Sequence, residues 1–407
     1  MREWTINGIS ILENGKPAVG KAPAIFTERD AEAALSFHRK IEGYRRTPLL
    51  SLPGLARRWG VRGIYVKDES ERFSLSSFKG LGGSYAMFRI ICERLGLDPE
   101  VTDLSEITSP EKRDSLSGMD FVTCTDGNHG RGVSWAAGLF GTRAHVLMPK
   151  GSEEVRAEAI RNAGPAEVTI TDVGYDDTVK IAREMSEKHG WILIQDTSWK
   201  GYETVPSWII QGYLTMAKET ADALESIDVL PTHLFLQAGV GAMAGGVISY
   251  FADRLGQDKP VVTIVEPKAA DCVYRSVKAG RKCSVESGEG TIMAGLDCGT
   301  PCSVTFPVIK DHAEFFISGP DRMAEEGMRA YAEGTDGDRP VVSGGSGAAT
   351  LGAAKAIMED PLFSDVKSAM GIDAGSILLF INTEGATDPE NYQRTVGNRV
   401  YNIQHCE

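Results

Sequence analysis

The feature that most constrains this chain is the alternation of short apolar runs with longer amphipathic segments. The runs are apolar throughout, which is typical of parallel strands covered by helices on both faces. The sequence therefore predicts an α/β protein with open, mainly parallel twisted sheets. The expected strands are 121–124, 144–148, 167–171, 191–195, 233–237, 261–265 and 377–381. The expected helices are 131–140, 153–163, 176–188, 207–224, 242–254, 322–333 and 347–358.

The alternation of expected strands and helices is interrupted once, near the stretch DTSWKGYET at 196–204. The break indicates two sheets in two domains: a small domain over 86–204, and a large domain made of 1–85 plus 205–407. Ligands of open parallel sheets bind at the carboxyl ends of the strands, so we expect the site in the cleft between the domains. The segment 102–118 is polar and lacks periodicity, and we expect it to be an exposed insertion.

Composition excludes several classes of function. The 407 residues are 42% hydrophobic and carry a net charge of -13, which argues against a nucleic-acid partner. No apolar run approaches the roughly 18 residues of a membrane span. The first residues carry charges at Arg2 and Glu3 and lack the apolar core of a signal peptide. We expect a cytoplasmic protein without a membrane partner.

The seven cysteines indicate mostly reduced thiols, since their number is odd. Cys272, Cys283, Cys298 and Cys302 cluster late in the chain, but no C-x2-C pair is present and no metal site is expected. A disulfide between Cys272 and Cys298 stays open.

The stretch LQAGVGAMAGGV at 236–247 places glycines between an expected strand and helix. Backbone N–H groups at such a junction bind phosphate. Gly239, Gly241 and Ala244 also fit the dinucleotide pattern G-x-G-x-x-A, and Glu266 lies where a ribose-binding acid belongs. A phosphate cradle, a dinucleotide site and close helix packing are the three alternatives.

Two further strand ends carry polar residues. In TCTDGNHG, Asn128 and His129 follow the strand 121–124, and in FINTEGATD, Thr383 follows the strand 377–381. A threonine hydroxyl there is able to meet a pyridine nitrogen without fully protonating it. Both stretches are also compatible with simple turns.

The stretch RFSLSSFKGLGG at 72–83 places Lys79 in the first turn of a helix that starts at Ser76 or Ser77. The helix dipole disfavours a cation there, lowers the pKa and favours the neutral amine. A neutral lysine forms Schiff bases with carbonyls. An aldehyde cofactor with a phosphate, pyridoxal 5'-phosphate (PLP), would use both Lys79 and the loop at 239–246.

These motifs together resemble the fold type II, or tryptophan synthase β-like, PLP enzymes. SSFKGLGG resembles their lysine segment, TDGNHG the loop that holds substrate carboxylate and ring oxygen, and GVGAMAGG their phosphate loop. The order and spacing agree from Thr47 to Asn382. Within this group, FSLSSFK, TDGNHGRG, LIQDTSW and GTIMAGLDCG most resemble diaminopropionate ammonia-lyases. The resemblance implies PLP as cofactor, conversion of D- or L-2,3-diaminopropionate to pyruvate and two ammonia, and a homodimer.

The resemblance also assigns roles to residues. Lys79 would form the Schiff base, Phe78 would pack on the ring, Asn128 would bond the ring hydroxyl, and Thr383 would meet the ring nitrogen. The phosphate would be held by Gly239, Val240, Gly241, Ala242, Met243, Ala244, Gly245 and Gly246. The substrate would contact Ser77, Thr125, Asp126, Gly127, His129 and Asp196.

Asp126 departs from the threonine and serine dehydratases of the wider group, which have a small residue there. Lys79 reaches the α-proton of one enantiomer only, and a carboxylate at Asp126 on the other face is able to take it from the opposite enantiomer. Asp126 is also able to pair with the second amino group of the substrate, and Asp196 is a candidate to orient that amine. For Asp196, a helix-entry cap before Ser198 or Trp199 is the alternative.

Three other functions stay open. They are a serine or threonine dehydratase of the same fold, a nicotinamide-dependent oxidoreductase that uses GVGAMA with Glu266, and a PLP-binding protein without turnover.

Overall fold

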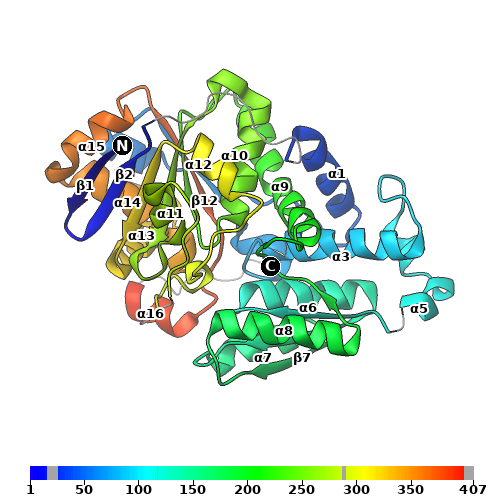
Figure 1. Ribbon diagram of the computed structural model, residues 1–407. Helices are drawn as coiled ribbons and strands as arrows, with labels where there is room; N and C mark the ends of the chain where they lie inside the picture. Colours follow the sequence, from blue (N-terminus) through cyan, green and yellow to red (C-terminus); the bar gives the residue numbers. More distant parts are fainter. Residues whose placement is uncertain (16–25, 117, 287–289, 398–407) are drawn as a thin grey trace.

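The computed structural model describes residues 1–15, 26–116, 118–286 and 290–397, and it contains two β-sheets (Figure 1). The smaller sheet is parallel throughout and has the strand order β7-β6-β5-β8. Its strands are β5 (Asp120–Cys124), β6 (Arg143–Met148), β7 (Ala166–Ile170) and β8 (Ile192–Leu193). Helices α6 (Asn128–Phe140), α7 (Glu154–Ala163) and α8 (Tyr175–His189) connect them.

The larger sheet has a parallel centre and antiparallel edges, in the order β1-β2-β11-β10-β9-β12-β4-β3. The central strands β11, β10, β9, β12 and β4 pair in parallel, whereas β1, β2 and β3 join antiparallel. The predicted class, two open and mainly parallel sheets, is confirmed. The strands are β1 (Arg2–Ile6), β2 (Ile9–Glu13), β3 (Leu49–Ser51), β4 (Gly63–Asp68), β9 (His233–Gln237), β10 (Val261–Pro267), β11 (Phe315–Gly319) and β12 (Ile377–Asn382).

Helices cover both sheets, and α3 (Lys79–Leu95) joins them by packing on α9 (Thr204–Glu225) and on α6. In Figure 1, α3 runs between α1 and α9 above and α6 below. The remaining helices are α1 (Glu28–Arg39), α2 (Pro53–Trp59), α10 (Ala242–Leu255), α11 (Cys272–Ala279), α12 (Phe306–His312), α13 (Asp321–Glu333), α14 (Gly345–Glu359), α15 (Ser364–Met370) and α16 (Pro389–Val396). Within the described ranges, none of the helices has the length and apolar character that crossing a membrane requires.

Glycines let α3 and α6 approach closely. A Cβ atom on Gly132 of α6 would lie 2.9 Å from the backbone of Lys79 and Gly80. Backbone atoms at that distance cannot yield without moving the helix, so glycine at 132 fixes where the first turn of α3 lies.

The segment 102–118, expected to be an exposed insertion, exposes most of its described side chains. The segment forms two short helices, α4 (Leu104–Ile107) and α5 (Pro110–Leu116). Ile107 and Leu116 are buried in the main apolar core, which anchors the segment. Lys40 also holds the start of the segment, since its Nζ donates to the carbonyl of Thr102 at 3.1 Å and lies 2.8 Å from Asp103 Oδ1. These few contacts form no periodic pattern in the sequence. Residue 117 lies outside the described residues.

Candidate active site

The carboxyl ends of both sheets border one cavity of about 680 Å³. Most residues predicted to form the site line it, namely Ser77, Phe78, Lys79, Thr125, Asp126, Asn128, His129, Asp196, Gly239, Val240, Gly241, Ala242, Met243, Ala244 and Thr383. Gly127 lines an adjoining cavity instead, together with Asp126 and Asn128.

Gly245 and Gly246 differ from the prediction, because they lie outside the cavity lining. The N–H of Gly245 donates to the carbonyl of Gly241, 2.9 Å away, inside α10. A Cβ on Gly245 or Gly246 would meet Thr305 at 2.4 Å or Ile210 at 2.7 Å. These two glycines serve close helix packing and offer no free N–H to a phosphate.

Lys79 begins α3 after a strained segment. Phe73, Ser74 and Ser76 adopt positive φ angles of 50°, 58° and 52°. Such angles cost non-glycine residues about 1–3 kcal/mol each, so surrounding contacts must hold them. Two backbone bonds do so from the end of β12: the N–H of Phe78 donates to the carbonyl of Thr383 and the N–H of Gly385 to that of Ser76.

A buried ionic cluster holds the other end of this segment. Arg72 pairs with Glu69 at 2.8 Å and with Glu219 of α9 at 2.7 Å, and Lys67 of β4 lies 2.6 Å from Glu219. All four side chains are almost fully excluded from solvent. The two cations and two anions neutralise one another, and they tie the segment before Lys79 to two elements of the fold.

The ammonium of Lys79 donates to Asp196 Oδ2, which also lies 3.7 Å from His129 Nδ1. Burial has the largest single effect on the pKa of Lys79 and lowers it, but Asp196 and the other acidic neighbours together raise the net pKa. The expected neutral amine is therefore wrong for the free protein, because the acidic neighbours favour the charged form. Burial raises the pKa of Asp196, yet His129 and Lys79 lower it to about 2 overall.

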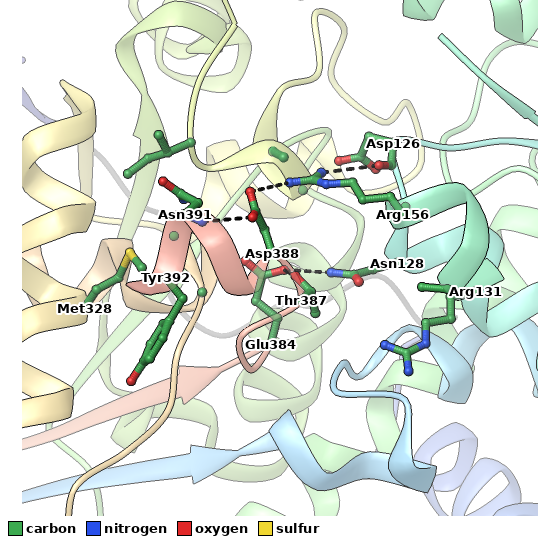
Figure 2. A pocket seen from close by; sticks show the side chains of 17 residues that line it. Asp126, Asn128, Arg131, Arg156, Met328, Glu384, Thr387, Asp388, Asn391 and Tyr392 are labelled. Carbon is green, nitrogen blue, oxygen red and sulfur yellow. Dashed lines mark hydrogen bonds and ion pairs between the residues drawn. The ribbon is translucent and has the colours of Figure 1, made fainter. Parts of the chain in front are cut away.

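Asp126 is the second carboxylate of the cavity. Burial raises its pKa to about 6, although the charge of Arg156 opposes this. Figure 2 shows Arg156 between Asp126 and Asp388, with its Nη1 donating to the Asp126 carbonyl at 3.3 Å and its Nη2 3.7 Å from Asp388 Oδ2. Asp126 therefore changes its charge near neutral pH, whereas Asp196 stays ionised.

The start of α6 supplies polar groups to the cavity. Thr125 Oγ1 accepts the N–H groups of Gly127 and Gly130 at 2.9 and 3.1 Å. These two bonds use the oxygen as acceptor, so the hydroxyl hydrogen remains available to donate to another group. Asn128 Nδ2 donates to Glu384 Oε2 at 2.7 Å (Figure 2). Nε2 of His129 lies 2.8 Å from the carbonyl of Ile194, which only accepts, so the hydrogen of the neutral ring lies on Nε2.

The glycine loop ends at the start of α10. Gly241, with φ of 85°, is the N-cap, and no side chain caps this helix. The first N–H groups of α10 thus face the cavity without a side-chain partner, as an anion site requires.

Glu266 does not border the cavity. Its buried carboxylate accepts the N–H groups of Val273 and Tyr274 at 2.8 and 2.6 Å and so caps α11. A ribose has no access to it, which removes the basis of the dinucleotide alternative.

The six cysteines within the described residues are free thiols, Cys272 and Cys298 among them. The disulfide left open by the sequence is not formed in this structure.

Sequence reasoning missed several residues that line the cavity, including Tyr175, Gln237, Cys298, Ser346 and Glu384. The positions of Gln237 and Glu384 in the sequence could have identified them as site residues, since each lies at or just after the carboxyl end of an expected strand. The other three come from helices and loops without a local pattern.

Comparisons with known proteins agree with this geometry. The model of the pyridoxal-phosphate dependent enzyme family matches residues 41–366. The diaminopropionate ammonia-lyase of Salmonella typhimurium is 43% identical over 387 residues, which are 94% of this chain and 96% of that protein. The Escherichia coli diaminopropionate ammonia-lyase in complex with D-serine has a TM-score of 0.90 at 41% identity, covering 97% of this chain and 98% of that chain. The same Escherichia coli enzyme in complex with an aminoacrylate-PLP azomethine reaction intermediate has a TM-score of 0.89 at 42% identity, covering 96% and 97%. The chain therefore belongs to the pyridoxal-phosphate dependent enzymes and, within them, to the diaminopropionate ammonia-lyases.

Proposed function

We propose that this protein eliminates ammonia from 2,3-diaminopropionate and yields pyruvate and two ammonia. The observation that carries the proposal is the charge pattern of the cavity, where Lys79, Asp126 and Asp196 line one space. A desolvated carboxylate needs a cationic partner. A diamino acid brings two amino groups, whereas serine and threonine bring one.

The chain's own groups fit pyridoxal phosphate. The uncapped N-terminus of α10, over 242–244, suits the phosphate. Asn128 Nδ2 has a second hydrogen for the ring hydroxyl, Phe78 offers an apolar face, and Thr383 offers a hydroxyl to the ring nitrogen. When bound, the cofactor supplies an aldehyde that bonds an amine and a ring that withdraws electrons from the α-carbon. We assign Lys79 as the amine that holds it.

The remaining chemistry belongs to the protein. The first turn of α6, with Thr125, Gly127 and His129, binds the substrate carboxylate, and Ser77 lines the same cavity as Thr125 and His129. Lys79 accepts the α-proton of one enantiomer and Asp126 that of the other. Asp196 pairs with the β-ammonium, which keeps this amine protonated so that it leaves as neutral ammonia.

The test is pyruvate release from D- and L-2,3-diaminopropionate, L-serine and L-threonine by the wild type and Asp196→Asn. We expect diaminopropionate to be the best substrate and Asp196→Asn to lose most of that preference by raising KM. Asp258→Asn, an exposed carboxylate on a short turn, is the matched control and is expected to behave as wild type. Serine as the best substrate of the wild type would refute the proposal.

We further propose that the protein acts as a homodimer in the cytoplasm and uses both enantiomers. The free thiols support a reducing compartment, and the resemblance to diaminopropionate ammonia-lyases supports the dimer. We also propose the domain boundaries 1–85 plus 205–407 and 86–204, since all strands of the smaller sheet come from 120–193. Light scattering of the purified protein tests the dimer, and limited proteolysis tests the boundaries.

A further inference from the structure

The strands β9 and β12 part at the wall of the cavity, and one side chain spans the gap. Their parallel pairing runs from Leu378 and His233 to Phe380 and Phe235. Two residues further on, Gln237 Nε2 donates to the carbonyl of Ile381 at 3.0 Å and to Thr383 Oγ1 at 2.8 Å. Gln237 and Thr383 are both buried. A glutamine side chain thus replaces the ladder bond that the diverging strands no longer make.

The orientation of the Gln237 amide follows from its partners. A backbone carbonyl only accepts, so the amide atom beside Ile381 must be the NH2 group. This group has two hydrogens, and the bonds to Ile381 and Thr383 use both. The opposite atom, Oε1 of Gln237, is buried without a hydrogen-bond partner.

The direction of the Thr383 hydroxyl follows in turn. Its oxygen accepts from Gln237, so its hydrogen cannot point at Gln237. The described residues give this hydroxyl no other side-chain partner, and Thr383 lines the cavity. The hydrogen is therefore directed into the space that a ligand occupies.

We propose that Gln237 is a positioning residue that makes Thr383 a permanent hydrogen-bond donor to the cofactor's ring nitrogen and so keeps that nitrogen unprotonated. The inference rests on the proposed function, because it uses the assignment of Thr383 to the ring nitrogen. A donor bonded to the neutral form disfavours the charged form. A ring nitrogen without a proton withdraws electrons less strongly, which favours departure of the β-amine over return of a proton to the α-carbon.

The substitution Gln237→Met tests this without a large loss of stability. It removes two hydrogen bonds, but it also removes a buried acceptor that has no partner, and the two effects oppose each other. Without the amide, the Thr383 hydroxyl is free to rotate and to present its lone pair to the ring nitrogen. Thr383→Val removes the donor outright. Gln211→Met is the control, because it removes a glutamine of α9 that bonds Asp30 of α1 and Arg89 of α3 and does not line the cavity.

The readout is the ¹⁵N chemical shift of the ring nitrogen in protein loaded with ¹⁵N-labelled cofactor, followed from pH 6 to 9. We expect the wild type and Gln211→Met to show an unprotonated nitrogen at every pH. Gln237→Met and Thr383→Val should shift toward the protonated form as the pH falls, and the double variant should match Thr383→Val alone, since Gln237 acts through Thr383. Thr383→Val should also weaken cofactor binding about two- to tenfold, the loss of one hydrogen bond.

Two results would overturn the inference, and they differ in meaning. A wild-type shift in Gln237→Met, with an altered shift in Thr383→Val, refutes the role of Gln237 and leaves the assignment of Thr383 intact. A wild-type shift in both variants refutes the assignment of Thr383 in the proposed function and the inference with it.

Discussion

The two enantiomers of diaminopropionate should differ in their dependence on pH, because the proposed function assigns Asp126 and Lys79 to opposite faces of the substrate. Asp126 acts as a base only when it is ionised, and burial raises its pKa to about 6. In the free enzyme its ionised fraction is about one tenth at pH 5 and more than about nine tenths at pH 8. The kcat/KM for the enantiomer that depends on Asp126 should therefore rise about tenfold over this range.

The assay is the initial rate of pyruvate formation for each enantiomer at constant ionic strength. At an unshifted pKa of 3.8, Asp126 would already be more than about nine tenths ionised at pH 5, and almost no rise would be seen. The other enantiomer is the internal control, since it shares the cofactor site and the stability of the protein. Asp126→Asn should lower kcat/KM about 10²- to 10⁴-fold for one enantiomer only.

Two variants at position 156 sharpen the test. The charge of Arg156 lowers the pKa of Asp126, so Arg156→Met should move the midpoint of the profile above pH 6. Arg156→Lys keeps the charge and should leave the midpoint near that of the wild type. An equal loss of kcat/KM for both enantiomers in Asp126→Asn would refute the assignment of Asp126 and Lys79 to different enantiomers. Wild-type pH profiles that coincide for the two enantiomers would refute it as well.

Three further predictions concern stability and packing. Glu219→Gln removes the anion that Arg72 and Lys67 share, and it should lower the free energy of unfolding by about 3–5 kcal/mol in guanidinium titrations. A change within about 0.5 kcal/mol would contradict the role of the ionic cluster. Gly132→Ala should cost about 1–3 kcal/mol by overpacking and lower kcat, whereas Gly174→Ala, with no atom within 4 Å, should do neither; equal effects would refute the packing argument. Gly245→Val should displace the start of α10 and weaken cofactor binding in equilibrium dialysis, and wild-type affinity would show that the contact with Thr305 is not tight.

Much of the fold follows from local patterns. The seven predicted strands are all present within a few residues of their predicted bounds, whereas β4 and β11 at the parallel centre of the larger sheet have no predicted counterpart. The missed strand β4 contains Lys67, whose charge interrupts the apolar run. Lys67 is tolerated there because it meets Glu219, 152 residues away in the chain. A partner at that distance is invisible to a pattern read along the sequence.

The hairpin of β1 and β2 shows a different limit. Asn7 and Gly8 form its turn, both with positive φ, which is a strong hairpin signal in sequence. The alternation of apolar runs with amphipathic segments predicts parallel strands joined by helices, and a hairpin of two antiparallel strands does not belong to that pattern. The sequence prediction therefore lacks β1 and β2, although Asn7 and Gly8 are typical of a hairpin turn.

The charge state of Lys79 shows why part of the site requires the structure. Position in a first turn predicts a lowered pKa, because the dipole is the only influence that sequence reveals. The three-dimensional structure adds burial, which lowers the pKa further, and Asp196 with other acidic neighbours, which together reverse the sign of the shift. Motifs identified which residues gather in the cavity, whereas their protonation depends on distances between segments that the sequence does not contain.

This pairing of Lys79 with Asp196 bears on substrate choice. In the free protein the lysine ammonium neutralises the buried Asp196, and His129 is the one other cationic type of side chain that pairs with this carboxylate among the described residues. With Lys79 as the proposed amine that holds the cofactor, cofactor binding would take away the partner of Asp196. The carboxylate then requires another cation, since a buried unpaired charge is strongly unfavourable. The β-ammonium of diaminopropionate is such a cation and the hydroxyl of serine is not, so under the proposed roles the binding of cofactor to Lys79 would itself favour a diamino acid.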